Sequence, residues 1–143
     1  LKGKDIETTR KACEKFKTMP VSIVNFVEGT RFTPDKHQRQ KSPFDNLLKP
    51  KAGGIAFVMQ AMGEQINRVV NVTIHYPEGI PNFIDFVSGK VNQVDVHIEV
   101  MPVSEELIGD YSNDNEFRVR FQSELNRLWS NKDEQLRALQ KQE

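Results

Sequence analysis

The chain has 143 residues, of which 28% are charged and 37% hydrophobic, and this is the composition of an ordinary globular protein rather than a disordered one. Lysine plus arginine and aspartate plus glutamate both number 20, so a zero net charge argues against a protein that binds polyanions over its whole surface. No apolar run approaches the roughly 20 residues that a membrane helix needs, and the single cysteine, Cys13, excludes an intrachain disulfide. We expect one domain over residues 1–143.

The first elements predicted along the chain are a helix and a strand. Asp5 is a suitable N-cap for a helix that runs to Phe16. Cys13 falls on the apolar face of this helix, where it serves as a small buried hydrophobe, with a reactive thiol as the alternative. After Pro20, the nearly continuous apolar run Val21–Phe26 predicts a strand that is covered on both faces.

A basic loop is predicted from Val27 to Pro50, because the regular apolar spacing disappears there and prolines recur. From Arg31 to Lys51 the chain carries six cations and two acids, a local excess of four positive charges. His37 lies in this stretch, where we expect it to be solvated, with a substrate contact as the alternative.

The second half of the chain is more regular. Helical spacing over Lys51–Met62 predicts a helix, and alternation over Val69–Tyr76 and Val94–Val100 predicts two strands. In the second strand the valines and Ile98 are expected to face inward, and its polar residues outward. The strands would place His75 and His97 on polar faces.

A long amphipathic helix is predicted from Asn113 to about Gln140. Its apolar stripe is formed by Phe117, Phe121, Leu125, Leu128 and Trp129. This stripe is expected to pack on the sheet, with an oligomer contact as the alternative. The order helix, strand, helix, strand, strand, helix makes α/β the expected fold class.

The chemistry is concentrated where the first predicted strand ends. Glu28, Gly29, Thr30 and Arg31 follow the apolar run directly. Ligands of open α/β sheets bind beyond the carboxyl ends of strands. Glycine lets the backbone approach an anion, and the planar guanidinium of Arg31 suits phosphate. The pattern therefore predicts an anion site, and the alternative is a surface ion pair between Glu28 and Arg31.

The run Phe26-Val27-Glu28-Gly29-Thr30-Arg31 resembles the Phe-x-Glu-Gly-Thr-Arg motif of the glycerolipid acyltransferases. Lys51-Ala52-Gly53 resembles the Lys-x-Gly signature that follows in this family, and Val72-Thr73-Ile74 its later strand motif. The run from Asn25 to His37 is most similar to the branch that acts on 1-acylglycerol-3-phosphate, the lysophosphatidic acid acyltransferases. The resemblance covers Leu1 to Tyr76.

The resemblance implies an α/β sheet with flanking helices, like that of glycerol-3-phosphate acyltransferase, and a reaction without a cofactor. A fatty acyl group passes from a thioester of coenzyme A or acyl carrier protein to the hydroxyl of a lysophospholipid acceptor. Glu28, Gly29, Thr30, Arg31 and Lys51 would bind this acceptor, with Arg31 and Lys51 on its phosphate. The resemblance also implies a protein associated with the cytoplasmic face of a membrane.

The family's catalytic His-x-x-x-x-Asp motif does not occur in the chain. The residues five positions after its histidines are Ser42 after His37, Ile80 after His75 and Pro102 after His97. We therefore expect a soluble C-terminal part of an acyltransferase domain that is inactive by itself and contains no catalytic residue. No histidine spacing predicts a metal site.

The basic loop leaves several interpretations open. It can attract a phosphorylated acceptor and a nucleotide-bearing donor, lie against anionic lipid headgroups, or simply be solvated. The alternative to an acyltransferase is a non-catalytic phosphate- or RNA-binding module. Against nucleic acid, Phe32 and Phe44 are the only aromatic residues there that could stack on bases.

Overall fold

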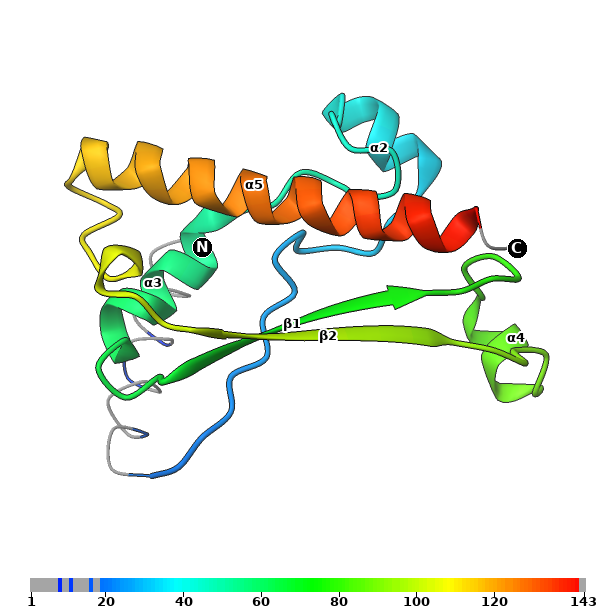
Figure 1. Cartoon of the computed structure of the whole chain (residues 1–143), viewed down its shortest axis with the longest axis horizontal. Coiled ribbons are helices and arrows are strands. Elements are labelled where there is room, and N and C mark those ends of the chain that lie inside the picture. The colour runs from blue at the N-terminus through cyan, green and yellow to red at the C-terminus, as the bar shows by residue number, and fades with distance from the viewer. Residues whose placement is uncertain (1–7, 9–10, 12–15, 17–18, 142–143) are drawn as a thin grey trace.

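The structure is a computed structural model that describes Thr8, Lys11, Phe16 and residues 19–141. Strands β1 (Arg68–His75) and β2 (Asp95–Pro102) form an antiparallel pair, and helix α5 (Asn115–Gln140) lies along it (Figure 1). Helix α3 (Ala52–Met62) lies at one end of the pair and the short helix α4 (Phe83–Val87) at the other. The fold is therefore mixed α/β. The helix predicted from Asp5 to Phe16 lies, apart from three residues, outside the described part of the chain.

The core forms where α5 packs against α3 and the loop that precedes α3. Asp114 is the N-cap of α5, one residue beyond the predicted helix start at Asn113, and its side chain accepts a hydrogen bond from the amide of Phe117 at 3.0 Å. The predicted apolar stripe is buried except for Leu128, which is only partly buried, but it packs against α3 and the loop before α3 and not, as predicted, on the sheet. The buried members of the cluster are Phe44, Ala52, Ala56, Phe117, Phe121, Leu125 and Trp129.

The basic segment is not the irregular loop that the sequence predicts throughout, because it contains helix α2 (Pro34–Gln40). Thr33 caps this helix by accepting a hydrogen bond from the amide of Lys36, and Pro34 occupies its first turn. Lys41 ends the helix in the left-handed conformation, with φ of 48°. Beyond η1 (Glu105–Leu107), a short 3-10 helix, the chain enters α5.

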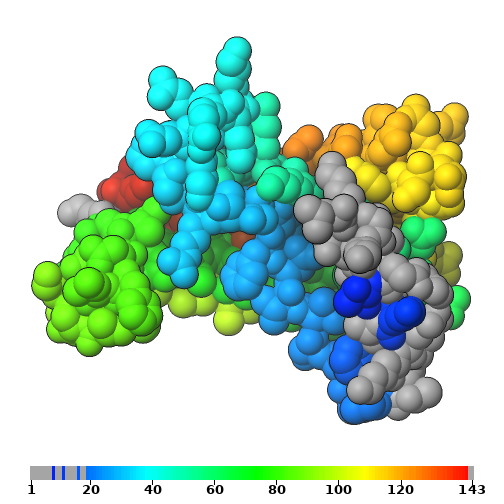
Figure 2. All heavy atoms as spheres, turned by 180° about the vertical axis from the view of Figure 1, so that it is seen from behind, coloured from blue at the N-terminus to red at the C-terminus, as the bar shows by residue number. Residues whose placement is uncertain are grey.

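The strand predicted over Val21–Phe26 is not formed. These residues carry no strand hydrogen bonding, and the side chains of Val24 and Phe26 are exposed. A strand exists only with a neighbour, and the described sheet contains β1 and β2 alone. Figure 2 shows this part of the chain, in blue, on the surface of the face opposite to the view in Figure 1.

The sheet turns its polar side inward, which reverses the facing predicted for Val94–Val100. Asn71, Thr73 and His75 of β1 are buried on the side of α5, and Thr73 donates a hydrogen bond to Gln135 at 3.3 Å. On the outer side, the pairs Val70–Val100, Val72–Ile98 and Ile74–Val96 are exposed. The physical reason is that α5 presents polar side chains to β1, whereas nothing in the described part of the chain covers the apolar side.

The two strand histidines lie on a polar face of the sheet, as predicted. His75 and His97 share the polar side of the sheet, and Nδ1 of His75 lies 3.3 Å from a carboxylate oxygen of Asp95. Among the helices of the described residues, none is long and apolar enough to cross a bilayer.

Candidate anion-binding site

The turn after Phe26 brings Gly29 against Lys51. The amide of Gly29 donates to the carbonyl of Phe26 at 2.8 Å, and Gly29 has a φ of 70°, which side chains disfavour. A Cβ atom at Gly29 would lie 3.1 Å from Nζ of Lys51. The backbone conformation therefore favours glycine at this position, whereas a Cβ would require only a small shift of the flexible Lys51 side chain.

The start of α3 is tied to the same turn. The amide of Lys51, the N-cap residue, donates to the carbonyl of Val27 at 2.8 Å. No side chain caps the first turn of α3, and Gly53 and Gly54 within that turn are exposed. Free amides at a helix start, together with the lysine ammonium, form a positive environment that suits an anion.

Thr30 and Arg31 lie at the edge of this environment. Nζ of Lys36 donates to Oγ1 of Thr30 at 2.7 Å and to the carbonyl of Arg31 at 3.2 Å. Arg31 is exposed, and its guanidinium makes no hydrogen bond or ion pair with any residue in the described part of the chain. The sequence pointed to Arg31 and Lys51, whereas Lys36 is a third cation that α2 brings to the turn.

Glu28 points to α5 instead of pairing with Arg31, so the alternative of a Glu28–Arg31 surface ion pair is wrong. Its carboxylate accepts a hydrogen bond from Nε1 of Trp129 at 3.4 Å. Burial raises the pKa of Glu28, and the Trp129 bond, the backbone of Leu48 and the charge of Lys132 oppose the rise. Glu28 therefore anchors the turn to the helix.

Lys132 connects the same region of α5 to the sheet. Its ammonium donates to the carbonyl of Val72 at 2.6 Å and lies 5.3 Å from the centre of the Trp129 ring. Burial lowers the pKa of Lys132, although the nearby Glu28 opposes this effect. Sequence reasoning missed both α5 residues as contributors to the site.

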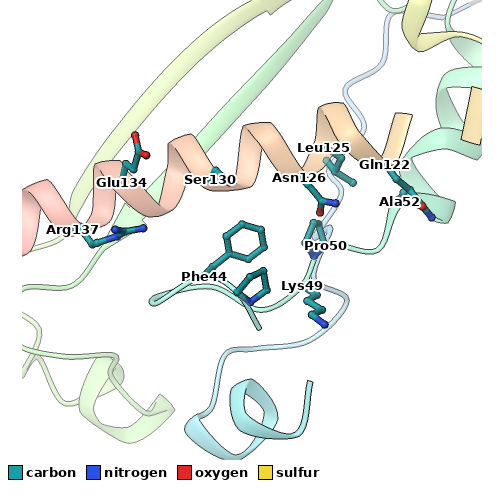
Figure 3. Close-up of a pocket in the computed structure, with 11 residues that line it drawn as sticks. Phe44, Lys49, Pro50, Ala52, Gln122, Leu125, Asn126, Ser130, Glu134 and Arg137 are labelled. Atoms are coloured by element: carbon teal, nitrogen blue, oxygen red, sulfur yellow. The ribbon is translucent and has the colours of Figure 1, made fainter. Parts of the chain in front are cut away.

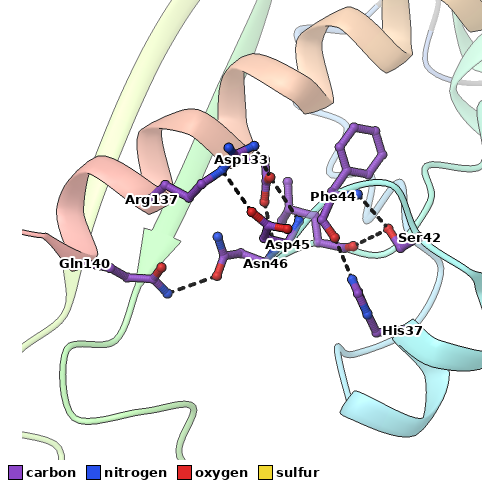
Figure 4. Close-up of polar contacts among 9 residues, drawn as sticks. His37, Ser42, Phe44, Asp45, Asn46, Asp133, Arg137 and Gln140 are labelled. Carbon is purple, nitrogen blue, oxygen red and sulfur yellow. Dashed lines mark hydrogen bonds and ion pairs between the residues drawn. The ribbon is translucent and has the colours of Figure 1, made fainter.

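A polar network holds the loop before α3 to α5 (Figure 4). The carboxylate of Asp133 accepts hydrogen bonds from the amides of Asp45 and Asn46 and from Arg137. His37, predicted to be solvated, is half-buried, and its Nε2 is hydrogen-bonded to the carbonyl of Phe44. The one signal for these α5 residues in the sequence is that Lys132 and Asp133 continue an apolar stripe in which charge is unexpected.

A groove of about 560 Å³ lies between this loop and α5 (Figure 3). Phe44, Lys49 and Pro50 line it from the loop, and Leu125 and Asn126 are among the α5 residues opposite. None of the predicted site residues lines it, so the groove and the turn are separate features. Within the described residues, no three His, Cys, Asp or Glu side chains are grouped to hold a metal ion.

Two curated acyltransferases are similar to the chain. It is 28% identical over 134 residues to a 2-acyl-1-lysophosphatidylinositol acyltransferase of Saccharomyces cerevisiae, a match that covers 80% of the chain. It is 30% identical, over an alignment of 120 residues, to a probable 1-acyl-sn-glycerol-3-phosphate acyltransferase 5 of Arabidopsis thaliana, a match that covers 74% of the chain. In both cases the match covers 32% of the relative, so the chain spans about a third of the length of these proteins.

No family model matches the chain, and no solved structure matches it. Family membership therefore rests on the two curated relatives, whose matches cover most of the chain. The chain belongs to the glycerolipid acyltransferase family.

Proposed function

We propose that the chain is the acceptor-binding part of a longer acyltransferase that acts on 1-acylglycerol-3-phosphate or a similar lysophospholipid. The observation that carries this proposal is the contact of Lys51 with Gly29 at the uncapped start of α3. The exposed guanidinium of Arg31 follows two residues later in the same turn. Together they offer a phosphate a fork of donors, an ammonium and free amides.

In this reaction the acceptor hydroxyl forms an ester bond with the acyl carbonyl, the C–S bond of the thioester breaks, and the free thiol leaves. The hydroxyl proton passes to a base and then to the departing sulfur. The residues of this chain would hold the phosphate, and so fix where the hydroxyl lies. The base is expected from a His-x-x-x-x-Asp motif outside these 143 residues, and the chain alone is expected to be inactive.

Within this proposal the predicted residues have different tasks. Arg31 and Lys51 bind the phosphate, and Gly29 and Thr30 shape the turn that they share. Glu28 supports the turn from the side of α5, because its carboxylate is directed to Trp129 and Leu48. The donor is a thioester of coenzyme A or acyl carrier protein, and no cofactor takes part.

The acceptor also suggests where the enzyme works. A lysophospholipid partitions into bilayers, so we propose that the complete enzyme is associated with the cytoplasmic face of a membrane. The basic segment that contains α2 would then face anionic headgroups. The alternative, an RNA-binding module, is disfavoured because Phe44 is not available to stack on bases: it is only 7% exposed and belongs to the core.

The test uses Arg31→Lys and Lys51→Ala in the complete enzyme, with two acceptors: 1-acylglycerol-3-phosphate and a monoacylglycerol that lacks phosphate. Losing a charge-assisted hydrogen bond costs about 1.5–3 kcal/mol, so kcat/KM for the phosphorylated acceptor should fall roughly ten- to a hundredfold. Arg31→Lys keeps the charge but loses the fork, and should still impair the enzyme. With monoacylglycerol both variants should resemble the wild type.

The matched control is Lys49→Ala, which removes an exposed cation two residues before Lys51. This substitution should leave kcat/KM nearly unchanged for both acceptors. If Arg31→Lys and Lys51→Ala instead reduce kcat/KM equally for both acceptors and lower the melting temperature, the turn has only a structural role and the proposal is wrong.

A further inference from the structure

Helix α5 contacts both segments that make up the anion site. Trp129 and Asp133 are four residues apart and therefore lie on one face of the helix. Nε1 of Trp129 reaches the carboxylate of Glu28, in the turn. The carboxylate of Asp133 accepts the amides of Asp45 at 3.0 Å and Asn46 at 2.7 Å, in the loop before α3.

The loop and the turn are also bonded directly to each other. The backbone of Leu48, which is fully buried at 0% exposure, lies near enough to the carboxylate of Glu28 to lower its pKa. Three residues later, the amide of Lys51 donates to the carbonyl of Val27. A displacement of the loop at Asp45 and Asn46 would therefore pass through Leu48 to Lys51, because few residues separate these points.

Asp133 is held firmly enough to act as a fixed point. Its side chain is 0% exposed, and each of its oxygens accepts one loop amide. Arg137, one turn further on, donates to the same carboxylate at 2.9 Å and lies 3.3 Å from Asp45. A buried carboxylate with three donors has one preferred orientation, since every donor must be matched to an oxygen.

We propose that Asp133 is a positioning residue for the phosphate site: by fixing the amides of Asp45 and Asn46, it holds Lys51 and the start of α3 against Gly29. This inference rests on the proposed function, because it assigns Asp133 to the site formed by Lys51 and Arg31. Asp133 itself does not touch the ligand. Its effect on phosphate binding should therefore depend on Lys51.

The decisive variant is Asp133→Asn, which preserves volume but replaces one acceptor oxygen by a donor that faces another donor. The probe is sn-glycerol 3-phosphate, titrated into the ¹⁵N-labelled full chain and followed by NMR at the amides of Gly29, Lys51 and Gly53. We expect the variant to bind roughly tenfold more weakly than the wild type, because small misplacements of binding groups carry large costs. Glu134→Gln, an equal charge change at the exposed neighbouring residue, should leave the affinity unchanged.

A double-mutant cycle distinguishes positioning from general destabilisation. In the Lys51→Ala background, Asp133→Asn should cause little further loss, because the group that it positions is gone. An equal loss in both backgrounds would overturn the inference. If melting curves show that Asp133→Asn does not fold, Asp133→Glu replaces it, since it retains the charge but displaces both oxygens, and weaker binding is again expected.

The two proposals fail in different ways. Wild-type chain that shows no response to glycerol 3-phosphate at Gly29 and Lys51 would contradict the phosphate site itself. Wild-type binding that is unchanged in Asp133→Asn would leave the site in place and overturn only the role of Asp133.

Discussion

Glu28 shows how a residue of a binding motif can face away from the ligand. Its carboxylate is half-buried between the indole of Trp129 and the amide of Leu48. Burial raises the pKa of Glu28, and the hydrogen bond from Trp129, the backbone of Leu48 and the charge of Lys132 oppose the rise. Its contacts join the turn, the loop before α3 and α5, so Glu28 contributes to the site through geometry.

The pH dependence of the free energy of unfolding should reveal the lowered pKa of Asp133. Burial acts to raise its pKa, but the amides of Asp45 and Asn46 and the guanidinium of Arg137 outweigh burial and hold the pKa below its usual value. The folded chain therefore binds this proton less tightly than the unfolded chain. The stabilisation is complete above the ordinary aspartate range, about pH 4, and is lost as the pH falls through the depressed value.

Urea unfolding of the chain at a series of pH values measures this effect. Asp133→Asn should flatten the decline in the free energy of unfolding below about pH 4. Glu28→Gln tests the opposite sign: a raised pKa makes stability fall as the pH rises above the ordinary glutamate range, and the variant should remove that fall. If the free energy of unfolding declines identically at low pH in Asp133→Asn and the wild type, Asp133 is not the source of this decline.

Individual residues of the site were partly predictable from the sequence. Gly29 and Lys51 are 22 positions apart, yet the family motifs marked both, and the structure brings them into contact. The roles of Trp129 and Asp133 in the site could not be predicted, because they depend on which side of α5 meets the loop. Periodicity assigns residues to a helix face, but it does not state what that face touches.

Among the elements, those with long and regular patterns were predicted well. Helix α5, α3 and both strands were expected within a few residues of their observed bounds. Helix α2 was missed although Thr33 and Pro34 are a typical helix start, because its seven residues present no apolar stripe and none of them is buried. The strand over Val21–Phe26 was wrongly predicted, because composition favours extended structure but cannot supply a pairing partner.

Phe121 should carry much of the stability of α5. It is buried between Phe117, whose ring centre lies 5.7 Å away, and Tyr111, which meets it edge-on at 5.9 Å. Phe121→Ala should lower the free energy of unfolding by about 3–5 kcal/mol, through lost burial and a cavity. Val119→Ala, at an exposed position of the same helix, should change it by less than about 0.5 kcal/mol.

Denaturant unfolding followed by circular dichroism measures both variants. Equal and small effects at the two positions would mean that the stripe of α5 is not the core of the molecule. If Phe121→Ala does not fold at all, a temperature-dependent measurement on Phe121→Leu gives the direction, because this substitution retains most of the apolar side chain.

At the scale of the whole molecule, the sheet has one polar side, which α5 covers at β1, and one apolar, exposed side. Six aliphatic side chains stand on the exposed side: Val70, Val72, Ile74, Val96, Ile98 and Val100. Helix α4, at the end of the hairpin, adds Phe83, Ile84, Phe86 and Val87, which are also exposed. Apolar surfaces of this extent on a soluble domain usually mark a contact with another surface.

The chain should therefore self-associate as its concentration rises. Ile98→Lys places a charge in the middle of the exposed side, where it opposes association without disturbing the core, since Ile98 is 60% exposed. Val119→Lys makes the same change on α5, outside the sheet, and should not affect association. Sedimentation velocity over a concentration series compares the three proteins, and a wild type that remains monomeric at high concentration would refute the expectation.

The hydrogen bond between Trp129 and Glu28 also makes Trp129 an intrinsic fluorescence probe of the turn. The chain contains one tryptophan, so all indole emission comes from the side chain that touches the turn. The cation of Lys132 lies against the same ring, and the core surrounds it. A shift in emission wavelength or lifetime therefore reports on the surroundings of Glu28, and the geometry of the turn can be followed in the unlabelled protein.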